Sequence, residues 1–550
     1  MHRASAAPQP PPNRSAVAAN TILATAPPSS AAAWDTETGL RLQALEAQWY
    51  NSANGAYFLY SRRTVDAVLA DPNWNAPGRS PYADALLGRQ LMLLYRVTLK
   101  PDYYASARQL RNRLAPSCGL APESIATPPS PPTPQPCVAQ AFLSNYAAEF
   151  QRPQDLLPLA RSFAQSSTSA ATHPAQDPSF AQAWSAASLV ESLPNFPQGD
   201  PAHAHALTSL RQLAAQLPGS PSPSATADCL TTYALLKAVR LHQLPPSFRA
   251  VAMRAWNRRL ASVRQPDPTN PATSLGAFLL ASTEADLAPT TADTVLLDAW
   301  FNSQQRTNAA GQPESFHYKF TDFSDSGYSL FDHMLQSAGL QTQTLFAAPT
   351  AANLQSAAYY LIVSPDIPIK NPNPHYITPA DADVIAAWVH RGGVLILMEN
   401  DPPNADIEHL NLLADRFGIH FLNVLHHHVL NDRVHGDLVE SGSIPVSPGG
   451  PLFHQSHTLY MKDTCAISLS RGATALLTDR GDVVMATARY GRGTVYANVD
   501  PWLYNEYTDG RNNPAVYSQF DNFAAGRELV QWLIQQRPQS PSPAKQKGKQ

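Results

Sequence analysis

The chain has 550 residues, of which 44% are hydrophobic and 15% charged, and its formal net charge is -3 at pH 7. This balance allows large buried cores, and it excludes a chain that is disordered throughout and a globally basic nucleic-acid binder. At about 150 residues per domain, the length predicts several domain-sized units. No run of eighteen or more apolar residues occurs, so we expect no membrane-spanning helix.

The proline content of the chain is unusually high, with 51 prolines and only 25 glycines. Many lie in polar stretches such as 128–136 and 218–226, which are typical of loops. Residues 1–33 and 538–550 carry few large apolar side chains, so we expect a disordered arm and a disordered tail. No signal peptide is visible. The compartment therefore stays open: cytoplasmic by default, secreted or periplasmic if an upstream signal is missing.

Apolar residues recur at three- and four-residue spacing over 34–288, which predicts an all-α domain of paired antiparallel helices. The predicted helices cover about 36–49, 57–70, 81–97, 101–114, 138–151, 153–165, 179–193, 202–216, 226–242, 246–262 and 273–285.

Over 289–537 the pattern changes, since short β-branched runs alternate with helical stretches. The apolar runs 359–365 and 394–400 are separated by a helical stretch that ends at Gly392 and Gly393. A strand, a helix, a glycine turn and a second strand in this order indicate a parallel sheet with crossover helices. We therefore predict an α/β domain over 289–537.

Polar side chains follow the predicted strands of this second domain. Asp366 follows 359–365, Glu399 ends 394–400, and a polar, aromatic stretch follows the last strand. Parallel sheets bind ligands at the carboxyl ends of their strands, so these groups indicate a site for a carbohydrate or other polar small molecule. A structural network of caps and turns explains the same residues equally well. The candidate substrate-binding residues here are Asp366, Glu399, Asp500, Trp502, Glu506 and Arg511.

No metal or cofactor motif stands out. His426, His427 and His428 lie near His435, but consecutive side chains point in different directions, so a polar loop is the favoured interpretation. The cysteines form no CxxC pair, and we expect them to be unpaired, although a bridge between residues 118 and 137 is conceivable. Phosphate-loop, GxSxG and HExxH motifs do not occur, and we expect no cofactor.

Several helical stretches occur in an order that is similar to one enzyme family, and they cover 39–69, 88–115, 141–156, 189–217, 228–256 and 274–287. Through them the helical half resembles the unsaturated glucuronyl and rhamnogalacturonyl hydrolases, glycoside hydrolase families 88 and 105. The resemblance implies an (α/α)6 six-hairpin barrel and pectin-derived unsaturated oligosaccharides as ligands. The stretches 316–335, 386–401 and 481–511 resemble a class I glutamine-amidotransferase-like, flavodoxin-like domain, without a Cys-His-Glu triad.

The catalytic motifs of the hydrolase family are eroded. The family uses an aspartate as general acid and base to hydrate a vinyl ether, and the corresponding stretch PPTPQPCVAQ (131–140) holds no acid. A second family aspartate falls on Ala83, which leaves Asp84 one residue late as the candidate catalytic group. The sugar-binding motifs survive only as Trp184 and, loosely, as His173.

We therefore predict a family 88/105-like protein of carbohydrate metabolism whose hydrolytic activity is weak or lost. One alternative is a working hydrolase that uses Asp84 or another carboxylate. Another is a carbohydrate-binding or partner-binding module that acts through the α/β domain. An unsaturated uronide is the expected partner, and the oligomeric state is left open.

Overall fold

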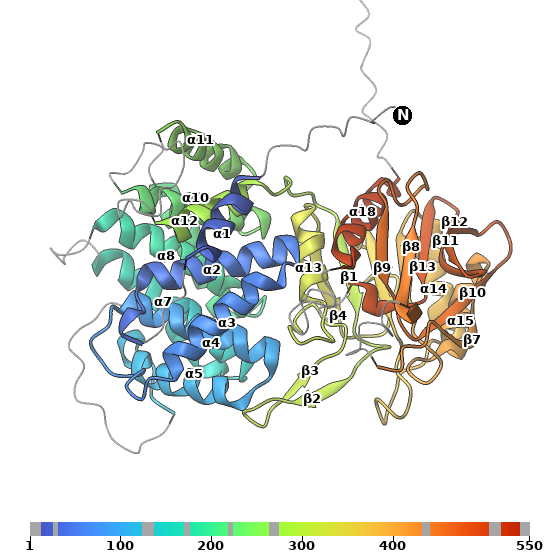
Figure 1. The fold of residues 1–550 in the computed structure, drawn as a ribbon, viewed down its shortest axis with the longest axis horizontal. Coiled ribbons are helices and arrows are strands. Elements are labelled where there is room, and N and C mark those ends of the chain that lie inside the picture. Colours follow the sequence, from blue (N-terminus) through green and yellow to red (C-terminus); the bar gives the residue numbers. More distant parts are fainter. Residues whose placement is uncertain are drawn as a thin grey trace, which may run out of the picture. The chain divides into compact units, whose positions relative to one another are not determined.

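The computed structural model describes residues 13–25, 31–123, 137–169, 177–217, 224–262, 274–431, 440–504 and 519–538. Its contacts divide the chain into two compact units, Met1–Ser52 with Ala56–Leu287, and Ala53–Gly55 with Ala288–Gln550. The described part of the first unit is helical, and the second unit is built on a β-sheet (Figure 1). The sequence predicted this change at residues 288 and 289.

Six helices of the first unit form a closed ring. Each packs on the next, and the last packs on the first. In ring order they are α2 (Thr36–Ser52), α4 (Pro81–Thr98), α6 (Gln140–Glu149), α8 (Pro178–Ser192), α10 (Ala225–Arg240) and α12 (Leu275–Ala285).

A second set of helices alternates with the ring helices along the chain, and most of them pack on the ring helix before them. They are α3 (Gly55–Leu69), α5 (Pro101–Leu114), α7 (Pro153–Ser169), α9 (Pro201–Gln216) and α11 (Ser247–Ser262). All eleven helices predicted over 34–288 are present, with ends that differ from the sequence estimate by a few residues.

One helix was not predicted. α1 (Arg14–Leu23) packs on α12 and α2, and its Ala18, Ala19 and Ile22 are buried. The disordered arm expected over 1–33 is therefore wrong for α1. Alanine supplies a thin apolar face that a search for large side chains overlooks, and it is the best helix former. Residues 1–12 and 539–550 lie outside the described residues.

Two glycines mark places where ring helices touch. A Cβ atom on Gly276 of α12 would lie 2.5 Å from the backbone of Leu40 and Arg41 in α2, and one on Gly88 of α4 would lie 2.5 Å from the Phe142 ring of α6. Glycine in a helix interior costs about 1 kcal/mol relative to alanine. The close approach of neighbouring helices explains why glycine stands there.

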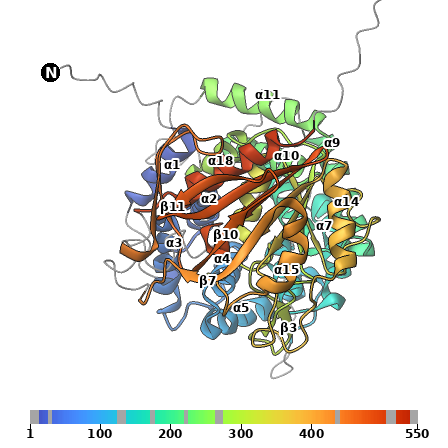
Figure 2. The ribbon, with the colours of Figure 1, turned by 90° about the vertical axis from the view of Figure 1, so that its right-hand side faces the viewer.

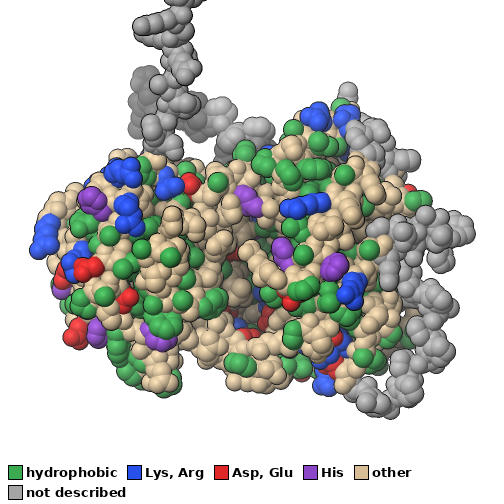
Figure 3. Space-filling model, turned by 180° about the vertical axis from the view of Figure 1, so that it is seen from behind, with side chains coloured by type: hydrophobic (Ala, Val, Ile, Leu, Met, Phe, Trp, Pro, Cys, Tyr) green, Lys and Arg blue, Asp and Glu red, His purple; other side chains and the backbone are tan. Residues whose placement is uncertain are grey.

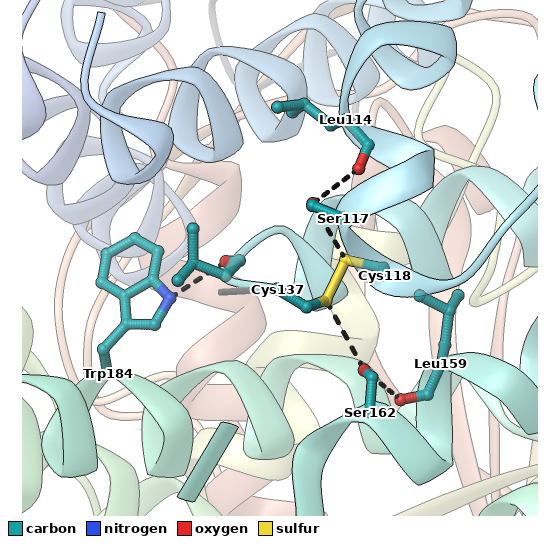
Figure 4. The surroundings of a disulfide bond; sticks show 8 residues. Leu114, Ser117, Cys118, Cys137, Leu159, Ser162 and Trp184 are labelled. Atoms are coloured by element: carbon teal, nitrogen blue, oxygen red, sulfur yellow. Dashed lines mark hydrogen bonds between the residues drawn. A yellow bond between two sulfur atoms is a disulfide. The ribbon is translucent and has the colours of Figure 1, made fainter. Parts of the chain in front are cut away.

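A disulfide joins Cys118, at the end of the short helix η2 (Ala115–Cys118), to Cys137 at the entry to α6, with a Cα–Cα distance of 4.8 Å. Figure 4 shows the Val138 carbonyl beside it accepting the Trp184 indole N–H at 3.0 Å. The expectation of unpaired cysteines is wrong for this pair, because the fold brings both sulfurs to one end of the ring. Cys229 and Cys465 are free and buried.

The second unit holds a nine-stranded sheet in the order β4-β1-β5-β6-β13-β12-β10-β7, with β11 paired to β12. The parallel strands are β4 (Gln341–Leu345), β1 (Thr294–Asp298), β5 (Tyr359–Val363), β6 (Val394–Met398) and β13 (Gly493–Asn498). Antiparallel pairing adds β12 (Asp482–Tyr490), β10 (Thr464–Leu469), β7 (Ile419–His426) and β11 (Thr474–Asp479). The predicted parallel sheet is wrong for these four strands, since antiparallel neighbours extend the sheet beyond β13.

Helices cover both faces of this sheet (Figure 2). Tyr360 of β5 and Tyr496 of β13 pair with consecutive residues of β6, so their side chains face opposite sides. Tyr360 packs on Trp388, and Tyr496 packs on Trp532. Trp388 belongs to α14 (Pro379–His390), and α15 (Ile407–Ala414) packs against that helix. Trp532 belongs to α18 (Asn522–Gln535), and α13 (Ser329–Ser337) packs against it.

Two small hairpins complete the described secondary structure of this unit. They are β2 (Gln305–Thr307) with β3 (Pro313–Ser315), and β8 (Ser443–Val446) with β9 (His457–Tyr460). No described helix has the length and apolar character needed to cross a bilayer. On the face drawn in Figure 3, charged side chains of both signs are scattered among uncharged surface.

We expect Gly276→Ala to destabilise the helical unit by about 1–3 kcal/mol, because its Cβ would push α12 away from the α2 backbone. Thermal unfolding followed by circular dichroism measures this. Gly450→Ala is the control, since a Cβ there meets no atom within 4 Å. Equal stability of the two variants would show that the ring tolerates wider spacing.

Candidate functional site

The helical ring contains a network of half-buried charges. Arg89 of α4 donates to Glu191 of α8 at 2.5 Å and to Glu46 of α2 at 3.2 Å. Lys237 of α10 donates to the other Glu191 oxygen at 2.6 Å, and the Tyr233 hydroxyl donates to the same oxygen. Four of the six ring helices are thus joined through one carboxylate and one guanidinium.

This network is charged in the folded protein. Burial alone would raise the pKa of Glu191, but the Arg89 and Lys237 charges hold that pKa well below its usual range. Burial alone would lower the pKa of Arg89, but Glu191 and Glu46 raise it above its ordinary value. Glu191 is therefore an ion-pair partner and no proton donor at neutral pH.

The cavity beside the network has a volume of about 30 Å³. A benzene-sized guest needs a cavity of about 150 Å³, so the space at this cavity cannot hold a sugar ring. Most of its lining is apolar, and Arg89 and Glu191 lie at its wall. The lining residues are Leu40, Gln43, Ala85, Leu86, Arg89, Val138, Ala141, Phe142, Trp184, Ala187, Ser188, Glu191, Leu230 and Tyr233.

Asp84, the candidate catalytic residue, is not among the lining residues of this cavity. It lies in the first turn of α4 and is 1% exposed. Arg79 donates to one of its carboxylate oxygens at 2.9 Å, and Arg113 donates to the other at 2.6 Å. Both oxygens are therefore bound by guanidinium groups, an arrangement that stabilises a charged carboxylate.

Trp184 does line the cavity, but its indole N–H is used by the Val138 carbonyl, and its ring packs edge-on against Tyr82 at 4.8 Å. His173 lies outside the described residues. Of the sugar-binding residues expected in the helical unit, Trp184 is thus the one that can be placed, and its described contacts are those of a core residue.

A second polar cluster lies at the carboxyl ends of the parallel strands. The structure brings Asp366, Glu399 and Asp500 to this one edge, after the neighbouring strands β5, β6 and β13. Trp502 lies there as well, and Lys462 is stacked over its ring at 4.3 Å. Glu506 and Arg511 lie outside the described residues.

Two of these carboxylates have both oxygens occupied. Asp366 accepts from the Ser303 N–H at 2.8 Å and from the Gln304 amide at 2.7 Å. Asp500 accepts from the backbone N–H groups of Lys462 at 2.9 Å and Trp502 at 2.7 Å. Asp366 and Asp500 therefore hold loops together, as the structural alternative predicted.

Glu399 is different. It is 0% exposed, one oxygen accepts from the Asn400 N–H at 2.8 Å, and the other has no hydrogen-bond partner. Burial raises the pKa of Glu399 well above its usual range, and the charges of Asp406 and Asp401 add to this. Burial therefore favours the protonated form of Glu399, and one oxygen of its side chain is left without a hydrogen-bond partner.

Sequence reasoning missed several residues around this edge. Lys319 donates to Asn302 at 2.7 Å, and burial lowers its pKa to about 8. His317 and Tyr318 are consecutive residues with φ values of 63° and 58°, a left-handed conformation that bulky side chains rarely adopt. Such strain gathers at functional sites. No sequence motif indicates this backbone strain, since it arises only where the folded chain passes over the edge of the sheet.

The three consecutive histidines do not converge on one point among the described residues, and His435 lies outside them. His426, His427 and His428 bind three different carboxylates, those of Asp482, Asp479 and Asp463. Within the described ranges no group of three or more potential ligands converges on one point.

Comparison with solved structures finds similarity over about half of the chain. A family 105 glycoside hydrolase from C. acetobutylicum is 15% identical, with a TM-score of 0.35, covering 50% of this chain and 99% of that one. A family 88 glycosyl hydrolase from Bacteroides vulgatus is 16% identical, with a TM-score of 0.35, covering 46% and 90%. A polysaccharide lyase is also 16% identical, with a TM-score of 0.35, covering 46% and 89%.

The helical unit resembles the six-hairpin glycosidases. At these identities and TM-scores, the similarity carries no inference about the chemistry of this chain. No family model matches the sequence. No curated protein matches it either.

We expect Arg89→Met to destabilise the helical unit by about 1–3 kcal/mol, because the half-buried Glu191 carboxylate would lose one of its two cationic partners. Arg416→Met is the matched control, since its pair with Asp383 is exposed and worth less than about 1 kcal/mol. Chemical denaturation measures both. If Arg89→Met lowers the free energy of unfolding by no more than Arg416→Met does, water rather than the protein solvates the network.

We expect the α/β unit to lose stability as the pH rises from about 6.5 to 8. Burial raises the pKa of Asp500 from 3.8 to about 8, so the folded state binds more protons than the unfolded state across this window. The Lys319 pKa of about 8 acts only above this window, and the lowered pKa of His317 acts only below it.

Urea unfolding at several pH values, for the wild type and for Asp500→Asn, measures the slope. Asp500→Asn loses one hydrogen bond from a backbone N–H, which changes its stability at every pH. The slope of the unfolding free energy against pH is therefore compared, and not its absolute value. An equal slope in both proteins would mean that Asp500 is ionised in the folded state.

Proposed function

We propose that this protein is a carbohydrate-metabolism protein with a family 88/105-like (α/α)6 barrel that has lost hydrolytic chemistry. The observation that carries this proposal is the pairing of the barrel's acids. Six carboxylates on the ring helices each bind an arginine or lysine, namely Glu37, Glu46, Asp84, Glu149, Glu191 and Glu284.

Hydration of an unsaturated uronide needs a carboxyl group that first donates a proton and then assists water. A carboxylate clamped by cations is a poor proton donor, because the neighbouring charges favour its ionised form. Glu191 is held in that state, since Arg89 and Lys237 keep its pKa well below its usual range. The Arg89–Glu191 network supports the proposal further, because it occupies the wall where a substrate would have to lie.

The space at the barrel centre supports the same proposal. About 30 Å³ is room for water and too little for a sugar ring. Phe142, Trp184 and Leu86 fill the interior from three different helices. A ligand of the unsaturated uronide class would therefore bind outside the described interior of the barrel.

A working hydrolase that uses Asp84 is the alternative. It would require Asp84 to leave both Arg79 and Arg113 and to face a wider cavity. Breaking a buried ion pair typically costs about 3–5 kcal/mol, which opposes this rearrangement.

For the second unit we propose an amidotransferase-like fold without amidotransferase chemistry, since Glu399 rather than a cysteine follows β6.

We expect no loss of the ultraviolet absorbance of the double bond when the protein is incubated for hours with an unsaturated rhamnogalacturonyl disaccharide. The reason is that the six ring carboxylates named above are held as ion pairs. An active family 105 hydrolase serves as the positive control. Rapid loss of absorbance by the wild type, abolished in Asp84→Asn, would refute the proposal and make Asp84 the catalytic residue.

A further inference from the structure

β4 is an edge strand of the nine-stranded sheet, and its described strand partner is β1. The Gln341 N–H and the Leu345 carbonyl both form hydrogen bonds of 2.9 Å to residues at the two ends of β1. In a parallel pair, the residues between such positions turn their N–H and C=O groups away from the partner strand. The backbone groups of Thr342, Thr344 and Phe346 therefore point to the free side of β4.

This free side is open. The outward N–H and C=O groups have no hydrogen-bond partner among the described residues. The side chain of Phe346 is 63% exposed, and those of Thr342 and Thr344 are half-buried. An edge strand with unpaired backbone groups is a template on which a further strand can pair.

The opposite edge strand of the sheet, β7, is covered instead. The Asn411 amide of α15 donates to the Phe421 carbonyl of β7 at 2.8 Å, and its oxygen accepts from the Phe421 N–H at 2.9 Å. Asn411 thus occupies the backbone groups that another strand would need. The described residues provide no such cover for β4.

β4 also lacks the residues that usually prevent strand pairing. Natural proteins protect edge strands with charged side chains, prolines or bulges. The segment 334–365 contains no Asp, Glu, Lys, Arg or His, and β4 itself contains no proline and pairs with β1 without a bulge. Two copies of β4 can therefore meet without opposing like charges.

We propose that β4 pairs antiparallel with β4 of a second copy of this chain, about a two-fold axis at Thr344. In this register Thr344 exchanges two hydrogen bonds with its counterpart in the second copy. Thr342 of each copy likewise exchanges two with Phe346 of the other. The two sheets become one continuous sheet across the axis. This dimer does not depend on whether the helical unit hydrolyses anything.

The side chains of β4 are self-complementary in this register. Thr342, Thr344 and Phe346 share one face of the sheet, because alternate residues of a strand point the same way. The Gln336 amide of α13 donates to the Thr342 hydroxyl at 3.1 Å, so this face is the one that α13 covers. Threonine would lie opposite threonine at the axis, and Phe346 opposite Thr342, and pairs of aromatic and β-branched residues are favourable across strands. Pairing uses up both free edges, so assembly stops at two copies.

Sedimentation equilibrium on the full chain, from about 1 μM to about 100 μM, tests the dimer. We expect the average mass to rise from 59.6 kDa towards twice that value. The equilibrium should be reversible, because one short strand per copy buries less than the roughly 1,600 Å² of a stable complex. The mass of a single chain at every concentration would overturn the proposal, and so would species larger than a dimer.

Charge reversal at the axis tests the register. Thr344→Lys and Thr344→Glu each oppose two like charges, and each should weaken the dimer at least about tenfold. An equimolar mixture of the two should recover an affinity within about threefold of the wild type, because opposite charges then meet. Thr478→Lys is the matched control, since it changes an exposed threonine of β11 and should leave the dimer intact. A mixture that stays monomeric would refute this register.

Phe346→Ser provides a second, independent variant. It removes an exposed ring twice in each dimer, and should weaken the dimer at least about tenfold. Circular dichroism shows whether each variant is folded, and if the Thr344 variants are not, Phe346→Ser carries the test. A dimer as strong as the wild type in folded Phe346→Ser would mean that the copies meet through another surface and would overturn the proposal.

Discussion

The ion network around Arg89 is the constraint on which the helical unit depends. It brings α2, α4, α8 and α10 together at the wall of the ring cavity. A buried charge needs partners in fixed positions, so the network limits where every neighbouring side chain can lie. Packing around it leaves room for water alone. The carboxylates of this network thus serve as ion-pair partners that join the ring helices.

The α/β unit distributes its polar groups in the opposite way. Both carboxylate oxygens of Asp366 and of Asp500 accept hydrogen bonds from loop residues. Glu399 and Ser364 instead each have a buried side-chain oxygen without a hydrogen-bond partner. The two units therefore differ in how their polar groups are used, since six ring carboxylates pair with cations and Glu399 keeps one oxygen without a hydrogen-bond partner.

Much of this fold follows from local pattern. The eleven helices over 34–288 are readable because apolar residues repeat at helical spacing, and the parallel strands are readable from their apolar runs. α1 was missed because its buried face is small, and the antiparallel half of the sheet was missed because hairpins and crossovers look alike in one sequence. The position of Glu399 at the sheet edge could be predicted, because it ends an apolar run that predicts a strand. The pairing of Asp84 with Arg113 could not, because it depends on tertiary packing that the spacing of residues along the chain does not encode.

The position of α1 has a consequence for how the first unit can be made. Along the chain each ring helix except α12 is followed by a covering helix of the same unit, and the helix that packs outside α12 is the first one synthesised. The ring therefore closes head to tail, and α1 has α2 as a partner but lacks α12 until the last ring helix has left the ribosome. A chain started after α1 would leave one side of α12 uncovered. A circular permutant that begins at α2 and carries α1 behind α12 would turn this distant pair into an ordinary hairpin.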